Sequence, residues 1–202
     1  MRMRNIGNVF GKAVLAGVCI ALGGTVYLSV ENKIIGSLLF TIGLYAIVLN
    51  GLFLYTGKIG YLVVEQNKKE YLKILLTTWI GNLVGTGIGA LAVLQTRISG
   101  IAENVDAICA NKLVDSPVSI FILAVFCGML MYIAVDGFKE KGNPLILFMG
   151  VSVFILSGFE HCIANMFYFS LAGVWSVKAF LYLLIMTAGN SIGGILIPLI
   201  KK

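Results

Sequence analysis

The chain has 202 residues, of which 59% are hydrophobic and only 12% are charged, and its formal net charge is +6 at pH 7. Soluble domains carry about 25% charged residues, so this composition argues against a soluble globule and against a disordered chain. The cationic side chains stand in short clusters between long apolar runs, which is a membrane pattern and not that of a nucleic-acid-binding protein.

Charge-poor intervals follow one another along the chain. A membrane helix needs about 20 apolar residues to cross the bilayer core. The first interval follows a short basic segment and lacks a small-residue cleavage site, so we interpret it as a membrane helix and not as a cleaved signal peptide. The sequence predicts six transmembrane helices, framed by residues 12–31, 33–58, 73–97, 115–136, 143–178 and 178–201.

Six crossings place both termini on one side of the lipid bilayer, and the distribution of Lys and Arg selects that side. The side of the termini would carry eleven of these cations, namely Arg2, Arg4, Lys12, Lys58, Lys68, Lys69, Lys73, Lys139, Lys141, Lys201 and Lys202. The other side would carry four, namely Lys33, Arg97, Lys112 and Lys178. The bias predicts cytoplasmic termini in a cell (inner) membrane.

The second and fifth intervals are too long for one straight helix. The fifth would extend about 51 Å at about 1.5 Å per residue. Gly51 and Gly57 lie near the middle of the second interval, and Gly158 lies near the middle of the fifth. Because a broken membrane helix needs protein or a water-lined cavity to satisfy its freed backbone groups, two broken spans point to a pore.

A short motif occurs twice. Residues 81–85 and 189–193 both read Gly-Asn-x-x-Gly, and the same offset brings Gly51 near Gly158. A repeat of three spans enters the membrane from opposite faces in its two copies, which predicts a 3+3 inverted repeat. We therefore expect one channel domain over residues 1–202, with repeats of about 10–97 and 112–201 and with the two breaks meeting near the bilayer centre. The glycines themselves also suit ordinary close helix packing.

Four polar residues are candidates for chemistry. His161, the one histidine, is predicted at the centre of the fifth span, where burial of a polar ring indicates function. Glu160 is either a proton relay or counter-charge, or a carboxylate that caps freed backbone groups, and the capping interpretation is favoured. Lys112 either concentrates anions at a pore mouth or is a solvated loop lysine. Thr56 either donates to an anion or bonds to its own backbone.

The run Ser157-Gly158-Phe159-Glu160-His161-Cys162-Ile163-Ala164-Asn165-Met166-Phe167 resembles the signature of the formate/nitrite transporter family, S-G-F-E-H-S-I-A-N-M-F. Residues 54–57 (Leu-Tyr-Thr-Gly) resemble the L-F-T-G element of that family, and residues 79–85 and 189–194 resemble its third and sixth helices. Some residues depart from the family pattern: Cys162 replaces Ser, Phe53 replaces an acidic residue, and Gly128 stands where Asn is usual.

The resemblance implies an all-α, aquaporin-like protomer assembled as a homopentamer, with one pore per protomer. It implies an ion channel for anion transport, with formate, nitrite or hydrosulfide as the small monovalent anions. It also implies roles by position. The pore centre would consist of Thr56, His161 and Asn190, and Lys112 would be the outer lysine that attracts the anion. The constrictions would be formed above the centre by Phe40, Leu44 and Phe154, and below it by Leu54 and Tyr55. Glu160 and Asn165 would support the break.

A bare carboxylate is costly in a tube of low dielectric, with an idealised cost of order 20 kcal/mol, whereas the neutral acid avoids most of that. We therefore expect protons to be partners of transport, with His161 either donating the proton or binding the anion as a cation.

One alternative is an aquaporin-like channel for small neutral solutes, although the paired Asn-Pro-Ala elements are missing. A membrane enzyme or redox subunit is disfavoured, because one histidine and four scattered cysteines predict no metal site and no cofactor. A purely structural subunit would not need a charged pair beside a central break.

Overall fold

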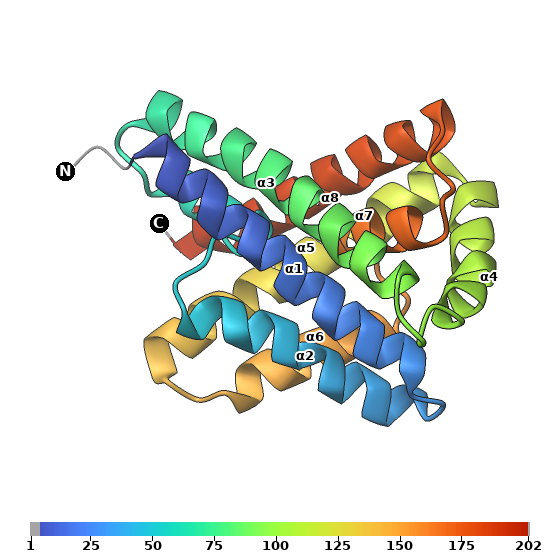
Figure 1. Cartoon of the computed structure of the whole chain (residues 1–202). Coiled ribbons are helices and arrows are strands. Elements are labelled where there is room, and N and C mark those ends of the chain that lie inside the picture. The colour runs from blue at the N-terminus through green and yellow to red at the C-terminus, as the bar shows by residue number, and fades with distance from the viewer. Residues whose placement is uncertain (1–4, 202) are drawn as a thin grey trace.

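The computed structural model describes residues 5–201, so Arg2, Arg4 and Lys202 of the charge count lie outside the described residues. Within that range all regular secondary structure is helical (Figure 1). The elements in order are α1 (Ile6–Ser29), α2 (Lys33–Leu49), the 3-10 helix η1 (Ile59–Val63), α3 (Lys68–Leu94), α4 (Ile101–Val114), α5 (Pro117–Lys141), α6 (Leu145–Leu156), α7 (Cys162–Leu171) and α8 (Val177–Lys201).

Side-chain caps set where several helices begin. The side-chain oxygens of Asn5, Asn32 and Asn67 accept backbone N–H groups at the starts of α1, α2 and α3. Ser116 does the same for α5, whose first residue is Pro117. Such residues satisfy the first orphan N–H groups of a helix, and a proline at the first position loses no hydrogen bond.

Among the described residues, four helices are long and apolar enough to cross a membrane, namely α1, α3, α5 and α8. The predicted second and fifth spans are divided. Helix α2 has 17 residues and is followed by non-helical residues 50–58, which we call the first interruption. Helices α6 and α7 have 12 and 10 residues and are separated by residues 157–161, which we call the second interruption.

The second residue of each interruption is a glycine whose backbone angles lie in the left-handed region. Gly51 has φ +57° and Gly158 has φ +68°, a conformation that L side chains rarely adopt. The N–H of the next residue then reaches back five residues: Leu52 donates to the carbonyl of Ile47 at 2.9 Å, and Phe159 donates to that of Phe154 at 2.9 Å. These are the bonds of a Schellman helix end, so α2 and α6 stop in the same way.

Two helix pairs pack closely through glycines. Helix α1 packs against α3, and α5 packs against α8 (Figure 1). A side chain at Gly85 would collide with the carbonyl oxygen of Val14, and one at Gly193 would collide with that of Val125. Since both positions belong to the Gly-Asn-x-x-Gly motif, the motif serves close approach of backbones in both halves of the chain.

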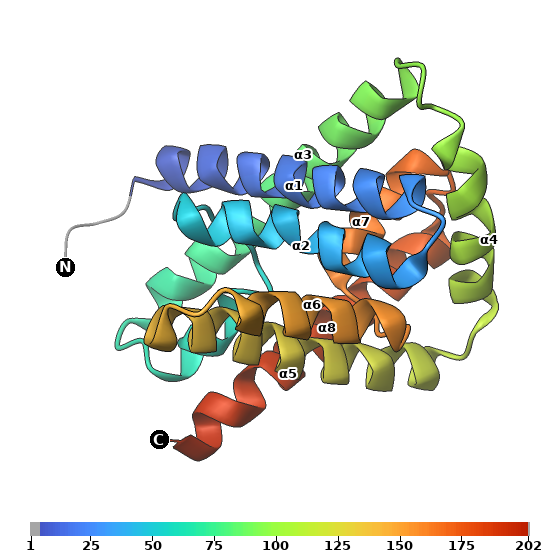
Figure 2. The same ribbon diagram turned by 90° about the horizontal axis from the view of Figure 1, so that it is seen from below.

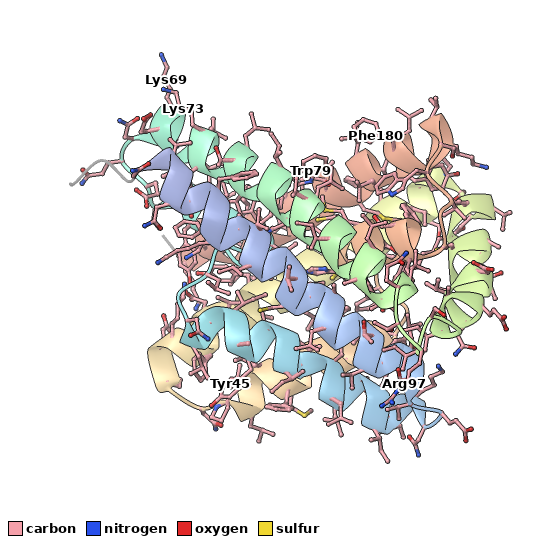
Figure 3. All side chains as sticks on the ribbon, viewed as in Figure 1. Tyr45, Lys69, Lys73, Trp79, Arg97 and Phe180 are labelled. Carbon is pink, nitrogen blue, oxygen red and sulfur yellow. The ribbon has the colours of Figure 1, made fainter. Side chains whose placement is uncertain are left out.

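Helix α4 was not predicted, because its residues were assigned to a loop. Seen from below, α1 begins and α8 ends on one side of the molecule, which we call the terminal side, whereas α4 stands on the opposite side, the α4 side (Figure 2). Apolar side chains such as Phe180 are exposed on the outside, whereas Lys69 and Lys73 project at the terminal side (Figure 3). An apolar exterior between polar ends is what a bilayer solvates.

Candidate functional site: a polar junction between two interruptions

The two interruptions meet at Thr56 and His161. The Thr56 hydroxyl oxygen lies 2.9 Å from Nε2 of His161, although the residues are 105 positions apart in the sequence. Both side chains are nearly inaccessible to solvent, at 1% and 2% exposure. The sequence predicted that these residues share the pore centre, and the structure brings them into one hydrogen bond.

The local backbone fixes which ring nitrogen carries the proton. His161 is the N-cap of α7, and its Nδ1 accepts the N–H of Ala164 at 3.0 Å. An acceptor nitrogen has no proton, so the neutral ring carries its proton on Nε2 and donates it to Thr56. The Thr56 hydroxyl hydrogen then has no acceptor among residues 5–201, and it is available to a ligand.

Asn190 holds the second interruption. Its Nδ2 donates to the carbonyls of Ala124 at 2.8 Å and Glu160 at 2.7 Å, and its Oδ1 accepts the N–H of Cys162 at 2.8 Å. The amide is thus engaged with backbone groups freed where the helix breaks. Its predicted contact with substrate stays a prediction, and the described role is to position His161.

Asn82 performs the corresponding task for the first interruption, and the sequence analysis did not single it out. Its Nδ2 donates to the carbonyls of Ala13 and Phe53, each at 2.8 Å, and its Oδ1 accepts the N–H of Tyr55 at 2.9 Å. The signal was present, because Asn82 and Asn190 are the asparagines of the repeated motif.

A buried ion pair lies beside the histidine. Nζ of Lys112 is 2.8 Å and 2.7 Å from the two carboxylate oxygens of Glu160, and the side chains are 14% and 4% exposed. Nδ2 of Asn165 donates to the same carboxylate at 2.8 Å and to the carbonyl of His161 at 3.0 Å. Lys112 is therefore not a solvated loop lysine. Its partner also neutralises its charge, so its effect on a ligand acts at short range.

Aromatic rings form the wall next to His161. The ring of Phe154 stacks on the imidazole with centroids 5.4 Å apart, and Phe40 meets Phe154 edge-on at 6.1 Å. Both phenylalanines were predicted in one apolar constriction. The structure places them against each other and against the polar centre.

Two cavities approach this centre from opposite ends. The cavity on the α4 side has a volume of about 140 Å³, and His161, Lys112 and Asn165 line it. A cavity of about 50 Å³ on the terminal side is lined by Leu44 and Leu54. The two cavities share no lining residue. His161 lines the α4-side cavity, and its partner Thr56 lies in the first interruption between Leu54 and Gly57, which line the terminal-side cavity.

Two of the predicted constriction residues have surroundings that the sequence did not indicate. Leu44 was placed above the centre, beside Phe40, but it lines the same terminal-side cavity as Leu54. The hydroxyl of Tyr55 shares a hydrogen bond of 2.8 Å with Ser191 on α8. Leu44 follows Phe40 by about one helix turn, and Phe40 itself lines neither of the two cavities.

No group of three or more His, Cys, Asp or Glu side chains within residues 5–201 is arranged to hold a metal ion. The one imidazole has a threonine and a backbone amide as its partners. The arrangement thus offers hydrogen-bond donors and acceptors beside two cavities whose lining is mostly apolar, which suits binding and passage of a small polar solute.

The fold has apolar helices long enough to cross a membrane, and the site lies beside two cavities among them. The Formate/nitrite transporter family profile matches residues 2–200, and the chain belongs to that family. Members of this family are channels and transporters and not enzymes, so the prediction that this chain is not an enzyme is confirmed.

Relatives and solved structures agree with this assignment. The chain is 28% identical to the formate channel FocA of Haemophilus influenzae over 78% of its own length and 64% of that protein. It is 29% identical to a probable formate transporter of Methanothermobacter thermautotrophicus over 94% of its length and 85% of that protein. A solved structure described as a pentameric formate channel with formate bound aligns with a TM-score of 0.84 at 25% identity, covering 98% of this chain and 96% of the other. The chain thus spans somewhat less than two thirds of the Haemophilus protein.

Proposed function

We propose that this chain forms a membrane channel for small monovalent anions of weak acids, with formate, nitrite and hydrosulfide as candidate substrates. One observation carries the proposal: the buried Thr56–His161 hydrogen bond joins the two interruptions, and residues of each interruption line one of two separate cavities. Relatives named as formate channels support the choice of a carboxylate.

The polar centre has a donor and an acceptor to offer. Because His161 donates to Thr56, the threonine O–H remains for an anion. Oδ1 of Asn165, a residue that lines the α4-side cavity, is buried and has no partner among the described residues. An acceptor of this kind suits the O–H of a protonated acid. The two groups thus recognise the charged and the neutral forms of the same solute.

Lys112 contributes at close range. A carboxylate uses at most two of the three N–H groups of an ammonium, so Lys112 keeps a donor for a ligand in the α4-side cavity. Glu160 cancels the net charge, so an anion bound there is not trapped by a bare cation. In this proposal Lys112 guides the anion to the centre, and the centre provides the setting for protonation.

The membrane arrangement completes the proposal. The second span would consist of α2 and η1, and the fifth of α6 and α7, which gives six crossings in a 3+3 inverted repeat. The terminal side would face the cytoplasm of a cell (inner) membrane, following the excess of Lys and Arg there. The pentameric channel that this chain resembles supports a homopentamer.

Solute uptake by proteoliposomes tests this function. Uptake of labelled formate is measured between about pH 5 and pH 8, the range in which an ordinary histidine titrates. Unlabelled formate, nitrite, hydrosulfide, lactate and chloride are each added as a possible competitor. We expect the first three to compete and chloride to fail. Glycerol swelling of the same liposomes is the control. Swelling without formate uptake would show a channel for neutral solutes.

A further inference from the structure

A further hollow lies on the α4 side, apart from the two cavities beside the polar centre. Its volume is about 890 Å³, and it lies where α1 and α3 end and α2 and α4 begin. Neither His161 nor Lys112 lines it, and it shares only Tyr27 and Ile108 with the α4-side cavity. We call it the helix-end hollow.

Charges of both signs line the helix-end hollow. They belong to Glu31, Lys33 and Arg97, which are all exposed. Among residues 5–201, no ion pair and no side-chain hydrogen bond engages Glu31 or Arg97. Figure 3 shows Arg97 beside the turn between α1 and α2. One anionic and one cationic group of the protein are therefore open to a ligand that carries both charges.

Two contacts hold the walls of this hollow. Nδ2 of Asn104 on α4 donates to the carbonyl of Leu28 on α1 at 3.2 Å. Nζ of Lys33 lies 4.9 Å from the ring centre of Tyr27, which is a cation–π contact. Because Lys33 rests on that ring, we assign the ligand to Arg97, whose planar guanidinium matches the oxygens of a phosphate.

The hollow lies at the level where membrane-crossing helices end. Helices α1 and α3 are both long enough to cross the bilayer, and they end at Ser29 and Leu94. Apolar side chains nearby are exposed, with Ile34 at 62% and Ile98 at 42%. Tyrosine and cationic side chains beside apolar ones are typical of the layer in which lipid headgroups lie.

We propose that the helix-end hollow binds the headgroup of a phospholipid that carries a primary ammonium, as phosphatidylethanolamine does. The guanidinium of Arg97 donates to the lipid phosphate, and the carboxylate of Glu31 accepts from the lipid ammonium. The acyl chains lie against Ile34 and Ile98. A zwitterionic headgroup satisfies both open charges, whereas an anionic headgroup leaves Glu31 without a cation. The inference depends on the membrane location of the chain and not on which solute it passes.

Native mass spectrometry of the protein in a mild detergent tests this site. Phosphatidylethanolamine, phosphatidylcholine and phosphatidylglycerol with identical acyl chains are titrated separately. Choline keeps the positive charge but has no N–H to donate, so we expect the ethanolamine lipid to bind about tenfold more tightly than the choline lipid. The glycerol lipid lacks the ammonium and should also bind more weakly. Glycerophosphoethanolamine, the headgroup without acyl chains, should fail to displace the bound lipid.

Variants separate the two contacts. Glu31→Gln should remove the preference for ethanolamine over choline. Arg97→Gln should weaken binding of all three lipids by about tenfold, and Arg97→Lys should keep most of it. Lys178→Gln is the matched control and should bind as wild type does. Lys178 is an α4-side lysine whose Nζ also lies over a tyrosine ring, 5.5 Å from the centre of Tyr182, but it does not line the hollow.

Three results would overturn the proposal. One is equal affinity of the wild type for the three lipids, and another is unchanged lipid binding by Arg97→Gln. The third is displacement of the lipid by the headgroup alone at the same concentration. Lipid that binds separated protomers but is absent from the intact oligomer would also contradict the site, because a neighbouring copy of the chain would then fill the hollow.

Discussion

Trp79 donates its indole N–H to the hydroxyl oxygen of Thr187 at 3.1 Å, and these two residues occupy the same place relative to the two Gly-Asn motifs, 108 positions apart. Equivalent positions of two repeats touch when they lie close to the axis that relates them. The contact therefore supports the proposed inverted repeat, whose axis would pass between α3 and α8.

Because Asn82 and Asn190 make matched hydrogen bonds, we expect their alanine variants to lose similar amounts of stability. Asn82→Ala and Asn190→Ala each remove three hydrogen bonds to the backbone of an interruption. At about 0.6 kcal/mol for a polar bond in a membrane protein, each loss should be about 2 kcal/mol. Unfolding in a graded detergent series measures it. A loss in only one of the two variants would argue against equivalent roles.

Glycine packing predicts a contrast within one helix. Gly85→Ala places a Cβ against the carbonyl of Val14, whereas Gly87→Ala meets nothing within 4 Å. We expect Gly85→Ala to lose about 1–3 kcal/mol of stability through overpacking and Gly87→Ala to gain slightly through helix propensity. Thermal unfolding of the purified variants compares them. Equal melting temperatures would contradict close packing of α1 against α3.

The ion pair between Lys112 and Glu160 predicts that a second substitution restores stability lost by the first. Lys112→Met leaves a buried carboxylate without its cation and should cost about 3 kcal/mol. Adding Glu160→Gln removes that charge and should restore most of the stability. Formate flux should stay low in the double variant, because the lysine donor in the α4-side cavity is gone. Thermal unfolding and flux are measured on the same preparations, and full recovery of flux would show that Lys112 serves structure alone.

Two substitutions of Thr56 distinguish the effect of its hydroxyl group on formate flux from the effect of its side-chain shape. Thr56→Ser keeps the hydroxyl that meets His161, whereas Thr56→Val keeps the volume and removes the donor. Removing one preorganised donor to an anion in a dry site can slow a process about a hundredfold, so formate flux should fall strongly in the valine variant only. Stopped-flow uptake by proteoliposomes measures it. Similar flux in both variants would remove Thr56 from the pathway.

The sequence was most informative where burial in a membrane restricts the choice of residues. A lone histidine in an apolar span, with glycines beside it, predicted a polar centre, and the structure pairs His161 with Thr56. The apolar runs predicted membrane helices, and α1, α3, α5 and α8 meet the length for crossing.

Other features depend on three-dimensional contacts that carry no local pattern. The ion pair between Lys112 and Glu160 depends on α4, which carries Lys112. The helical pattern of α4 is weak in the sequence because Asn104, Asp106 and Asn111 interrupt its apolar residues. The side on which Leu44 lies depends on how α2 rotates against α6, which no single-helix pattern fixes. The backbone partners of Asn82 and Asn190 follow from the packing of whole helices.

Formate flux through His161→Asn is the most direct test of the polar step between the two cavities. Asparagine is a good N-cap, so it can replace Nδ1 at the start of α7, but it is too short to reach Thr56. The account predicts a protein that unfolds near the wild-type temperature and whose formate flux is lower by about tenfold or more. Wild-type flux in a folded His161→Asn protein would contradict the account.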